Sequence, residues 1–578
     1  MTDLAQPVTP ASRGADTAAS QATTAITRSF RRGTGRGSWL TRAAIAIAAL
    51  LALPVLGVIA ALFQESGGAW QHMLETVLPG FVANTLYLTL LVGAGVFLVG
   101  VATAWLVTMC RFPGRRLFEW ALILPLAFPA YVIAYAYTDF LQHPGPVQTL
   151  LRDVTGWGPR DYWFPQIRSI EGAGLMFTLV LYPYVYLLAR TAFLNQSVCA
   201  LEVSRTLGRS AWSSFRHVAM PLARPAIVTG TALALMETLA DFGTVAHFGV
   251  PTFTTGIYRA WFSMGDRIAA AQLAASLLSF VLLLLFLERW QRGRARYFQT
   301  GRKYQELPGY RLRGWRAAAA LIACGLPLGL GFVLPLAILA EMHVTGGHDL
   351  FGPRYLTLFF NSFTLAGIAA GLAVALALIM AYAARLNPSP LTHSANRLAS
   401  IGYAVPGSII AVGVLIPLAA FDNALDGWMR ATFGISTGLL LTGSIAGLIF
   451  AYLVRFMAVA LNTVDSSLTK VTPSMDDAAR TLGAGSIGTL RRVHVPLLRG
   501  GLLTAGLIVF VDVMKELPAT LIMRPFNFDT LAVQAYRLAS DERLTEAATP
   551  SLAIVAAGLL PVILLSREIM KSRPGRKA

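Results

Sequence analysis

Twelve separate runs of mostly apolar residues, each long enough to cross a bilayer, are the feature that most constrains how this chain can fold. A helical span needs about 20 such residues, and within hydrocarbon every backbone polar group must be bonded inside the element, which favours helices. Of the 578 residues, 55% are hydrophobic and 13% are charged. The sequence predicts an all-α polytopic membrane protein with spans at 42–63, 84–109, 117–138, 172–194, 225–247, 268–287, 317–340, 361–384, 397–420, 436–460, 501–523 and 549–566.

The net charge of +18 is concentrated beside these runs rather than spread along the chain. Arginine and lysine gather in an N-terminal tail (1–38), a linker (289–316) and a C-terminal tail (571–578). Basic segments that flank spans usually face the cytoplasm and contact anionic lipid. We favour this interpretation of the basic segments over nucleic-acid binding. An even number of spans then predicts a multi-pass bacterial inner-membrane protein with both termini in the cytoplasm.

Two halves of the chain repeat one another in the same order. Arg-Thr-Leu-Gly occurs at 205–208 and at 480–483, an offset of 275 residues, and Pro221 and Pro496 follow at the same offset. A repeat of six spans keeps its orientation in the membrane, whereas an odd number would invert it. The sequence predicts a parallel six-plus-six repeat with halves at 39–288 and 317–570.

The segment between the fourth and fifth spans of each half repeats an acid, a glycine and a proline at one spacing. The acid stands six residues before the glycine, and the proline stands thirteen residues after it. This pattern resembles the EAA loop of ABC importer permeases: Glu-Ala-Ala, three residues, Gly, nine residues, Ile-x-Leu-Pro. Val203 and Ser204 replace the two alanines in the first half, and Asp477 replaces glutamate in the second.

The resemblance implies the type I ABC importer permease fold, with a short helix in each loop that docks on a cytoplasmic ATPase. A left-handed glycine would end that helix, and the proline would begin the next span. The matching residues are Glu202, Arg205, Gly208 and Pro221 in the first loop, and Asp477, Ala478, Ala479, Arg480, Gly483 and Pro496 in the second.

The partners and cofactors expected of such a chain follow from these two loops. The chain lacks a phosphate-binding G-x-x-x-x-G-K-[ST] loop, so ATP and Mg²⁺ would be held by a separate P-loop ATPase, and this subunit is not expected to be an enzyme. Two loops would seat two ATPase copies. The resemblance also implies a periplasmic substrate-binding protein. We expect no cofactor bound by the chain itself.

Beyond the loops, the chain resembles the ferric-iron branch of these permeases over residues 236–243, 253–261, 512–520 and 526–532. Thiamine, phosphonate and polyamine permeases share the architecture and stay open as alternatives. A secondary transporter of the major facilitator type also has twelve spans in two halves, but the duplicated loop argues against it. A membrane-embedded enzyme would need a catalytic cluster, and no such spacing occurs.

Four acids within the fifth and eleventh predicted spans form the candidate translocation path. They are Glu237, Asp241, Asp512 and Glu516. A charge at the bilayer centre costs at least about 2.5–3.5 kcal/mol, so such residues usually face a cavity or a partner. The two acids of each pair are four residues apart and would share a helical face; oxygen donors suit a hard cation such as Fe³⁺. Alternatively, the acids pair with Lys515 or cap neighbouring helices.

Two smaller features leave their roles open. The histidines and the three cysteines have no spacing that predicts a metal site, and the cysteines are expected to be buried as small apolar side chains. The aromatic segment 157–163, predicted to lie outside, would either meet a binding protein or anchor the chain at the membrane interface.

Overall fold

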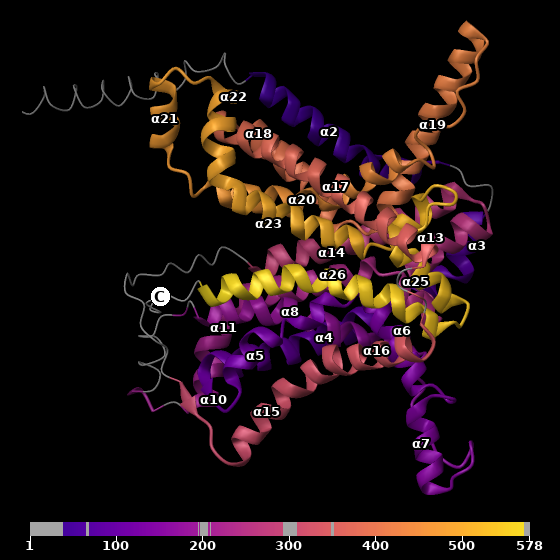
Figure 1. The fold of residues 1–578 in the computed structure, drawn as a ribbon, viewed down its shortest axis with the longest axis vertical. Coiled ribbons are helices and arrows are strands. Elements are labelled where there is room, and N and C mark those ends of the chain that lie inside the picture. Colours follow the sequence, from indigo (N-terminus) through magenta and orange to yellow (C-terminus); the bar gives the residue numbers. More distant parts are fainter. Residues whose placement is uncertain are drawn as a thin grey trace, which may run out of the picture.

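The chain folds into a bundle of long, roughly aligned helices (Figure 1). The computed structural model describes residues 38–64, 69–194, 196, 206–208, 210–292, 309–347, 349 and 352–571. Residues 1–37 and 572–578 of the predicted tails, most of the predicted linker and Cys199 therefore lie outside the described residues. Two short strands, β1 (Cys110–Arg111) and β2 (Tyr310–Arg311), pair in parallel. Cys110 and Cys324 are buried, as predicted, and burial raises the pKa of the Cys110 thiol to about 11.

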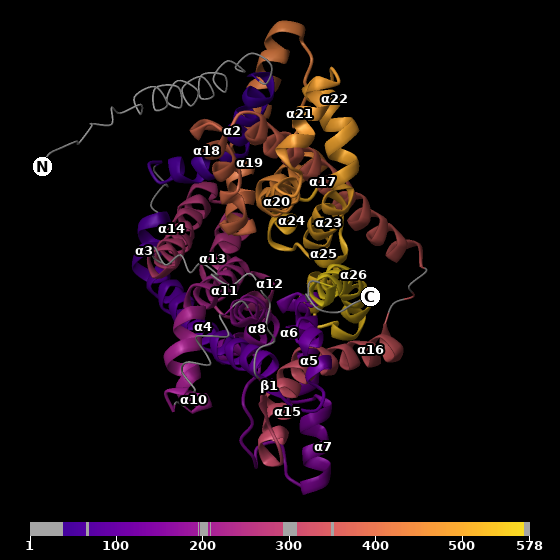
Figure 2. The same ribbon diagram turned by 90° about the vertical axis from the view of Figure 1, so that its left-hand side faces the viewer.

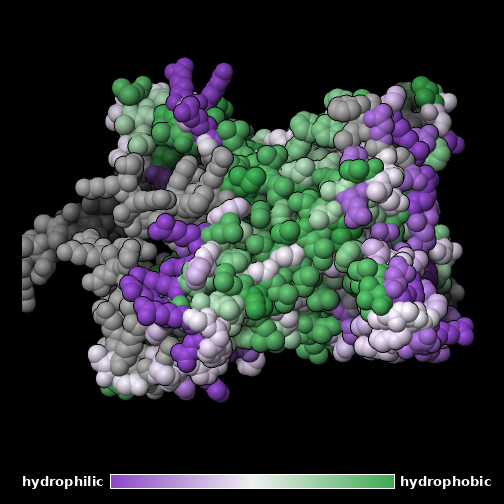
Figure 3. Space-filling view, turned by 60° about the horizontal axis from the view of Figure 1, so that its bottom comes forward, coloured by the Kyte–Doolittle hydropathy of each residue, from purple (hydrophilic) through white to green (hydrophobic). Residues whose placement is uncertain are grey.

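The described residues contain eleven helices that are long and apolar enough to cross a membrane. A twelfth span exists if Arg115–Ala127 and Ala130–Thr155, bent by 91° to one another, are taken as one. On the face seen in Figure 3, an apolar belt lies between two hydrophilic edges. The helices and this belt confirm the predicted all-α polytopic fold. The eleven helices are Trp39–Ala61, Leu78–Met109, Ile170–Leu194, Trp212–Ala240, Arg267–Gln291, Trp315–Gly346, Pro353–Leu386, Gly407–Phe433, Ile445–Leu468, Ser486–Met514 and Leu544–Leu564.

The elements follow one another in the same order in both halves. The first half has α2 (Ser38–Ala61), α3 (Ala69–Thr76), α4 (Leu78–Met109), α5 (Arg115–Ala121), η1 (Leu124–Ala127), α6 (Ala130–Leu141), α7 (Pro146–Thr155), α8 (Ile170–Leu194), α10 (Ala211–Ser214), η2 (Phe215–Ala219), α11 (Met220–Ala240), α12 (Gly243–His247), α13 (Phe253–Tyr258), η3 (Arg259–Ser263) and α14 (Arg267–Arg292).

The second half has α15 (Trp315–Leu328), η4 (Gly329–Val333), α16 (Leu334–Gly346), α17 (Pro353–Leu386), α18 (Pro390–Ala399), η5 (Ile401–Ala404), α19 (Gly407–Phe433), α20 (Ile445–Leu468), α21 (Pro473–Thr481), α22 (Ser486–Thr489), η6 (Leu490–His494), α23 (Val495–Met514), α24 (Pro518–Met523), α25 (Leu531–Ser540) and α26 (Leu544–Lys571). The π-helical segments η2 and η6 are 275 residues apart, which is the offset of the sequence repeat.

The first span of each half packs on the other half (Figure 2). Helix α2 lies against α17, α18 and α19, whereas α15, η4 and α16 lie against α4, α6 and α8, with α16 also against α26. Glycines allow the close crossings, as small residues commonly do between membrane helices. A Cβ on Gly413 would stand 2.3 Å from the Pro54 carbonyl oxygen, and one on Gly331 would stand 2.7 Å from that of Leu179. The two halves are therefore interlocked.

The third span of each half is broken, contrary to the continuous helices predicted at 117–138 and 397–420. Helix α6 begins after Pro129 (ψ 142°), and α19 begins after Pro406 (ψ 143°). Proline lacks an N–H and disfavours helical backbone at the residue before it, and Phe128 and Val405 are indeed extended. After the breaks, α6 and the first part of α19 still pack in the bundle, whereas α7 and the end of α19 project from it (Figure 1).

We predicted that the loop prolines begin the fifth and eleventh spans, but the helices start before them. Pro221 and Pro496 do stand in the first turns of α11 and α23, but each helical run starts earlier, at Trp212 and Ser486. The π-helical segments η2 and η6 come immediately before. A local π adjustment lets a helix pass a residue that has no N–H to donate, so one continuous rod joins each loop to the membrane.

Candidate functional site

The helices that carry the four candidate acids both break within the membrane. Helix α11 ends at Ala240 and α23 ends at Met514, several residues before the ends predicted at 247 and 523. After each break the chain restarts as a short helix, α12 or α24. The predicted sharing of one helical face is therefore wrong for both pairs, because the second acid of each pair lies beyond the end of its helix.

Asp241 and Glu516, the acids that follow the breaks, cap the next short helices. The carboxylate of Asp241 accepts hydrogen bonds from Thr244 N (2.9 Å) and Thr244 Oγ1 (3.1 Å). Glu516 accepts from Ala519 N (2.9 Å), Thr520 N (3.0 Å) and Thr520 Oγ1 (2.7 Å). An acid at a helix N-terminus satisfies otherwise unpaired N–H groups and complements the helix dipole.

Glu237 and Asp512 lie before the breaks and cap no helix. The Tyr403 hydroxyl donates to Glu237 Oε1 at 3.4 Å. Asp512 Oδ1 is 2.9 Å from Lys515 Nζ. A second cation is also present, since Arg455 Nη1 lies 3.5 Å from Glu516 Oε1.

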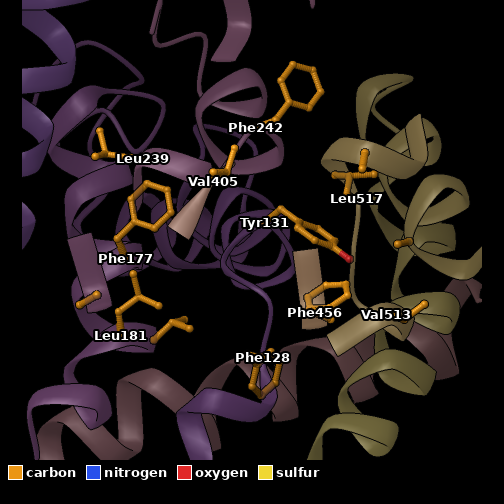
Figure 4. Packing of buried hydrophobic residues seen from close by; sticks show 14 of the residues in the cluster. Phe128, Tyr131, Phe177, Leu181, Leu239, Phe242, Val405, Phe456, Val513 and Leu517 are labelled. Atoms are coloured by element: carbon orange, nitrogen blue, oxygen red, sulfur yellow. The ribbon is translucent and has the colours of Figure 1, made fainter. Parts of the chain in front are cut away.

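All four acids meet in one cavity of about 110 Å³ between the two halves. Its wall comes from α8, the end of α11 and the start of α6 on one side, and from α20 and the end of α23 on the other. Tyr131 lies at this boundary, close to Phe456 and with its hydroxyl toward the second half (Figure 4). The structure thus brings the predicted residues together, while three of them also make the capping or Lys515 contacts of the alternative interpretation.

Four polar residues of this cavity were missing from the sequence prediction. They are Arg455, Tyr131, Tyr184 and Tyr403. A signal for Arg455 existed, because it is a charge inside the apolar run 436–460, and intramembrane charges usually mark a functional cavity. The tyrosines gave no signal, since aromatic residues are frequent in apolar runs.

A larger hollow of about 560 Å³ lies between α4, α11 and α14 and contains none of the four acids. Its wall is mostly apolar side chains, so the smaller cavity is the one with the chemistry of a polar site. Within the part of the chain that the structure describes, no three His, Cys, Asp or Glu side chains are placed to hold a metal ion.

Residues that follow the breaks join the two halves on one side of the acids. The Tyr131 hydroxyl donates to the Lys515 carbonyl oxygen at 3.3 Å, and the Tyr258 hydroxyl donates to the carbonyl of Pro518. Phe242 stacks on Tyr258. Near the outer edge of the same side, Arg168 makes two hydrogen bonds of 2.8 and 2.7 Å to the carboxylate of Glu542.

The second of the two loops that resemble the EAA motif has the predicted helix and turn. Helix α21 is followed by Gly483 with φ of +80°, and Gly208 of the first loop has φ of +76°. Both glycines therefore adopt the predicted left-handed conformation. Glu202 and Arg205 lie outside the described residues.

The exposed face of the second loop carries most of the motif. Asp477 and Arg480 form an exposed ion pair at 3.3 Å, and Ala478, Gly483 and Pro496 are also exposed. Ala479 is buried, so it packs inward rather than toward a partner. Gly208 and Pro221 are exposed in the first loop.

A buried acid next to the motif anchors this loop to the membrane helices. Asp476 Oδ1 lies 2.6 Å from His494 Nε2, and its Oδ2 accepts a 2.9 Å hydrogen bond from Arg385 Nε. Arg385 also donates to the carbonyl oxygens of Leu468 (2.8 Å) and Val471 (2.7 Å). This cluster ties α21 to the ends of α17 and α20 and to η6. The sequence prediction missed it because it concerned only the residues of the motif.

The fold and these two loops define the class of protein. Residues 96–297 match the family of binding-protein-dependent transport system inner membrane components. This match and the multi-span fold support an ABC-type permease of an inner-membrane transport system, a family whose members work with a binding protein and an ATPase.

Among characterised permeases, the chain is similar to the Fe(3+)-transport system permease protein FbpB 2 of Haemophilus influenzae, with 26% identity over 92% of this chain and 99% of that protein. It is 23% identical to the probable ABC transporter permease protein y4fN of Sinorhizobium fredii over 85% of this chain and 87% of that one. The molybdenum transport system permease protein ModB of Escherichia coli is 29% identical over 33% of this chain and 83% of its own length.

Proposed function

We propose that this chain is the membrane-spanning subunit of an ATP-driven importer of ferric iron, with both halves of the pore in one polypeptide. The observation that carries the proposal is the cavity in which Glu237, Asp241, Asp512 and Glu516 meet between the halves. The relative that matches nearly the whole chain is named as an Fe(3+) permease. The cavity's two cations are fewer than its four acids, which favours a cationic substrate.

The acids would form a transient site for the ion rather than a storage site. Fe³⁺ prefers hard oxygen donors such as carboxylates, and Glu237 and Asp512 offer oxygens that cap no helix. A permease that receives its substrate from a binding protein has no need of strong binding, because the ion must also leave.

A second candidate substrate is an oxyanion such as molybdate. Arg455 and Lys515 line the same cavity, and a molybdenum permease matches one third of the chain. In the structure, however, each of these cations lies beside an acid, Glu516 at 3.5 Å and Asp512 at 2.9 Å. An anion would have to displace those acids, so we favour the cation.

The proposed assembly has two ATPase copies at the coupling loops, which bind ATP and Mg²⁺, while this chain binds no nucleotide. The loops and both termini would face the cytoplasm. A periplasmic binding protein would dock on the opposite side and deliver the ion to the cavity. Alternating access would then open the cavity to each side in turn.

The second half offers a direct mechanical link from loop to cavity. The helical run Ser486–Met514 has 29 residues and is therefore about 43 Å long. Its loop end is fixed to α21 by His494 and Asp476, and its other end carries Asp512 and leads into Glu516. A displacement of α21 by the ATPase would thus move the acids of this half.

The test is uptake of radioactive iron into vesicles that contain the permease, its ATPase and its binding protein. Because Asp241 and Glu516 are caps, the sharper variants are Glu237→Gln and Asp512→Asn, which keep the shape of the side chains. We expect these variants to lose uptake while they still copurify with the ATPase; the same is predicted for Asp241→Asn with Glu516→Gln. Unchanged iron uptake in all of these variants would refute the path role. Uptake of molybdate but not iron by the wild type would favour the anion.

A further inference from the structure

Two arms extend from the bundle on the side opposite α21, one from each half. The first arm comprises residues 145–169, which contain α7, and the second arm comprises residues 421–443, which contain the end of α19. In both ribbon views they project at opposite ends of the longest axis, one at the bottom and one at the top (Figures 1 and 2). They therefore point away from the central cavity rather than over it.

The first arm buries some of its polar groups and exposes several large apolar side chains. Gln148 is buried; its side chain donates to the Leu141 carbonyl oxygen at 2.8 Å and accepts from the Tyr162 hydroxyl at 2.8 Å. Arg152 donates to the same tyrosine at 3.0 Å. Its exposed side chains include Leu150, Val154, Trp157 and Trp163, the last of which is 85% exposed, beside polar ones such as Asp153 and Arg160.

The second arm likewise buries acids and exposes large apolar side chains, with different residues. Asp422 is fully buried and accepts hydrogen bonds from Leu441 N and Thr442 N, at 3.1 and 2.7 Å. Asp426 accepts from Thr437 N and Gly438 N, at 2.8 and 3.0 Å. The exposed apolar side chains are Phe421, Trp428, Phe433, Ile435, Leu439 and Leu440.

The exposed apolar side chains of each arm would be stabilised by an apolar neighbour. Exposed apolar side chains of this kind mark a protein or membrane contact, and the position favours the membrane. In Figure 1 both arms project across the direction of the long helices, at the end of the bundle away from α21, so they would lie along the surface of a membrane that the long helices cross. Tryptophan is enriched at that depth of the bilayer.

We infer that the two arms lie in the interfacial layer of the outer leaflet and bind phospholipid through Trp163 and Trp428. The contact depends on apolar burial rather than on charge, because the two arms together contain four basic and four acidic residues. Arms that lie flat in this layer on both sides of the bundle would resist tilting of the halves. This role does not depend on the transported substrate.

The experiment uses the full-length permease in complex with its ATPase, reconstituted in phosphatidylcholine vesicles with brominated acyl chains. Single cysteines at Trp163→Cys and Trp428→Cys, in a chain whose three native cysteines are alanine, carry a small fluorophore. Arg160→Cys and Asn423→Cys are matched controls, because both are exposed polar residues of the same arms. Each labelled complex must retain its ATPase activity.

We expect brominated lipid to quench the probes at 163 and 428, and aqueous iodide to quench those at 160 and 423. Replacing part of the phosphatidylcholine with anionic phosphatidylglycerol should leave the quenching unchanged. The inference fails if iodide quenches all four probes and brominated lipid quenches none. It also fails if the probes at 163 and 428 are shielded only after the purified binding protein is added, which would make the arms a protein-docking surface.

Discussion

The two halves share a backbone plan but differ in where they place buried charge. At the offset of 275 residues, Arg455 corresponds to Val180, and Lys515 corresponds to Ala240. Both cations of the central cavity therefore come from the second half. The two EAA-like loops differ in the same way, because the second loop again has the charged or polar residues. Its Asp476 and His494 correspond to the apolar Leu201 and Ala219 of the first.

This difference separates what the fold requires from what the cavity requires. The π segments, the left-handed glycines and the capping acids occur in both halves, since each half must stop and restart its helices. The charges that balance the acids are needed only once, because the cavity is single. Four cations in this space would neutralise the acids and remove the reason for a cation to enter.

The largest loss of stability is expected from removing Arg455, one of the two cavity cations that only the second half has. Arg455→Met leaves Glu516 buried without its partner, and breaking a buried ion pair costs about 3–5 kcal/mol. Thermal unfolding in detergent measures the loss. Adding Glu516→Gln should recover part of it because the uncompensated charge is gone. An Arg455→Met variant as stable as wild type would mean that Arg455 is not needed to balance the buried charge of Glu516.

The loop comparison is sharpened by replacing two neighbouring acids. Asp476→Asn weakens charged hydrogen bonds to His494 and Arg385, each worth about 1.5–3 kcal/mol, and should lower both stability and stimulation of the ATPase. Asp477→Asn, its exposed neighbour, should change stability by no more than about 0.5 kcal/mol. Equal effects of the two variants on unfolding would contradict the anchoring role of Asp476.

The first span of each half packs on the other half, and tightening either of these two helix crossings should lower stability by a similar amount. Gly413→Val and Gly331→Val place side-chain atoms against the carbonyl oxygens of Pro54 and Leu179, and overpacking of this kind costs about 1–3 kcal/mol. Gly427→Ala, on the same helix as Gly413 but with nothing within 4 Å, is the matched control. It should be neutral or slightly stabilising, because alanine is the better helix former. Unfolding temperatures of the three variants make the comparison.

The smallest effect concerns the ion pair that links the halves at the outer edge. Hydrogen bonds from Arg168 hold the pKa of Glu542 below its ordinary value. The pair therefore stabilises the protein above that ordinary pKa, and the contribution is lost as the pH falls through the lowered one. Both side chains are more than a third exposed, so the pair is worth only about 0.2–1 kcal/mol. Glu542→Gln should unfold slightly more easily than wild type at pH 7, and the difference should shrink as the pH falls below the ordinary pKa of glutamate.

The sequence by itself determined the class of the fold, the approximate positions of most spans and the left-handed loop glycines. Apolar length is a local property that the bilayer enforces, and a glycine after a short helix is a local signal as well. The four acids were also found from sequence, because a charge inside an apolar run is costly wherever the helix packs.

Only the tertiary structure decided how those acids are used. Whether the fifth span continues past Ala240 depends on what receives the freed backbone groups, and α12 and α24 can form there only because Asp241 and Glu516 cap them. The partners of these acids, Arg455 and Tyr403, come from other helices at a sequence distance that no spacing rule covers. The packing of each first span on the other half could not be predicted from the sequence either. Any apolar helix can pack against any other, and only close packing in the folded protein selects the neighbour.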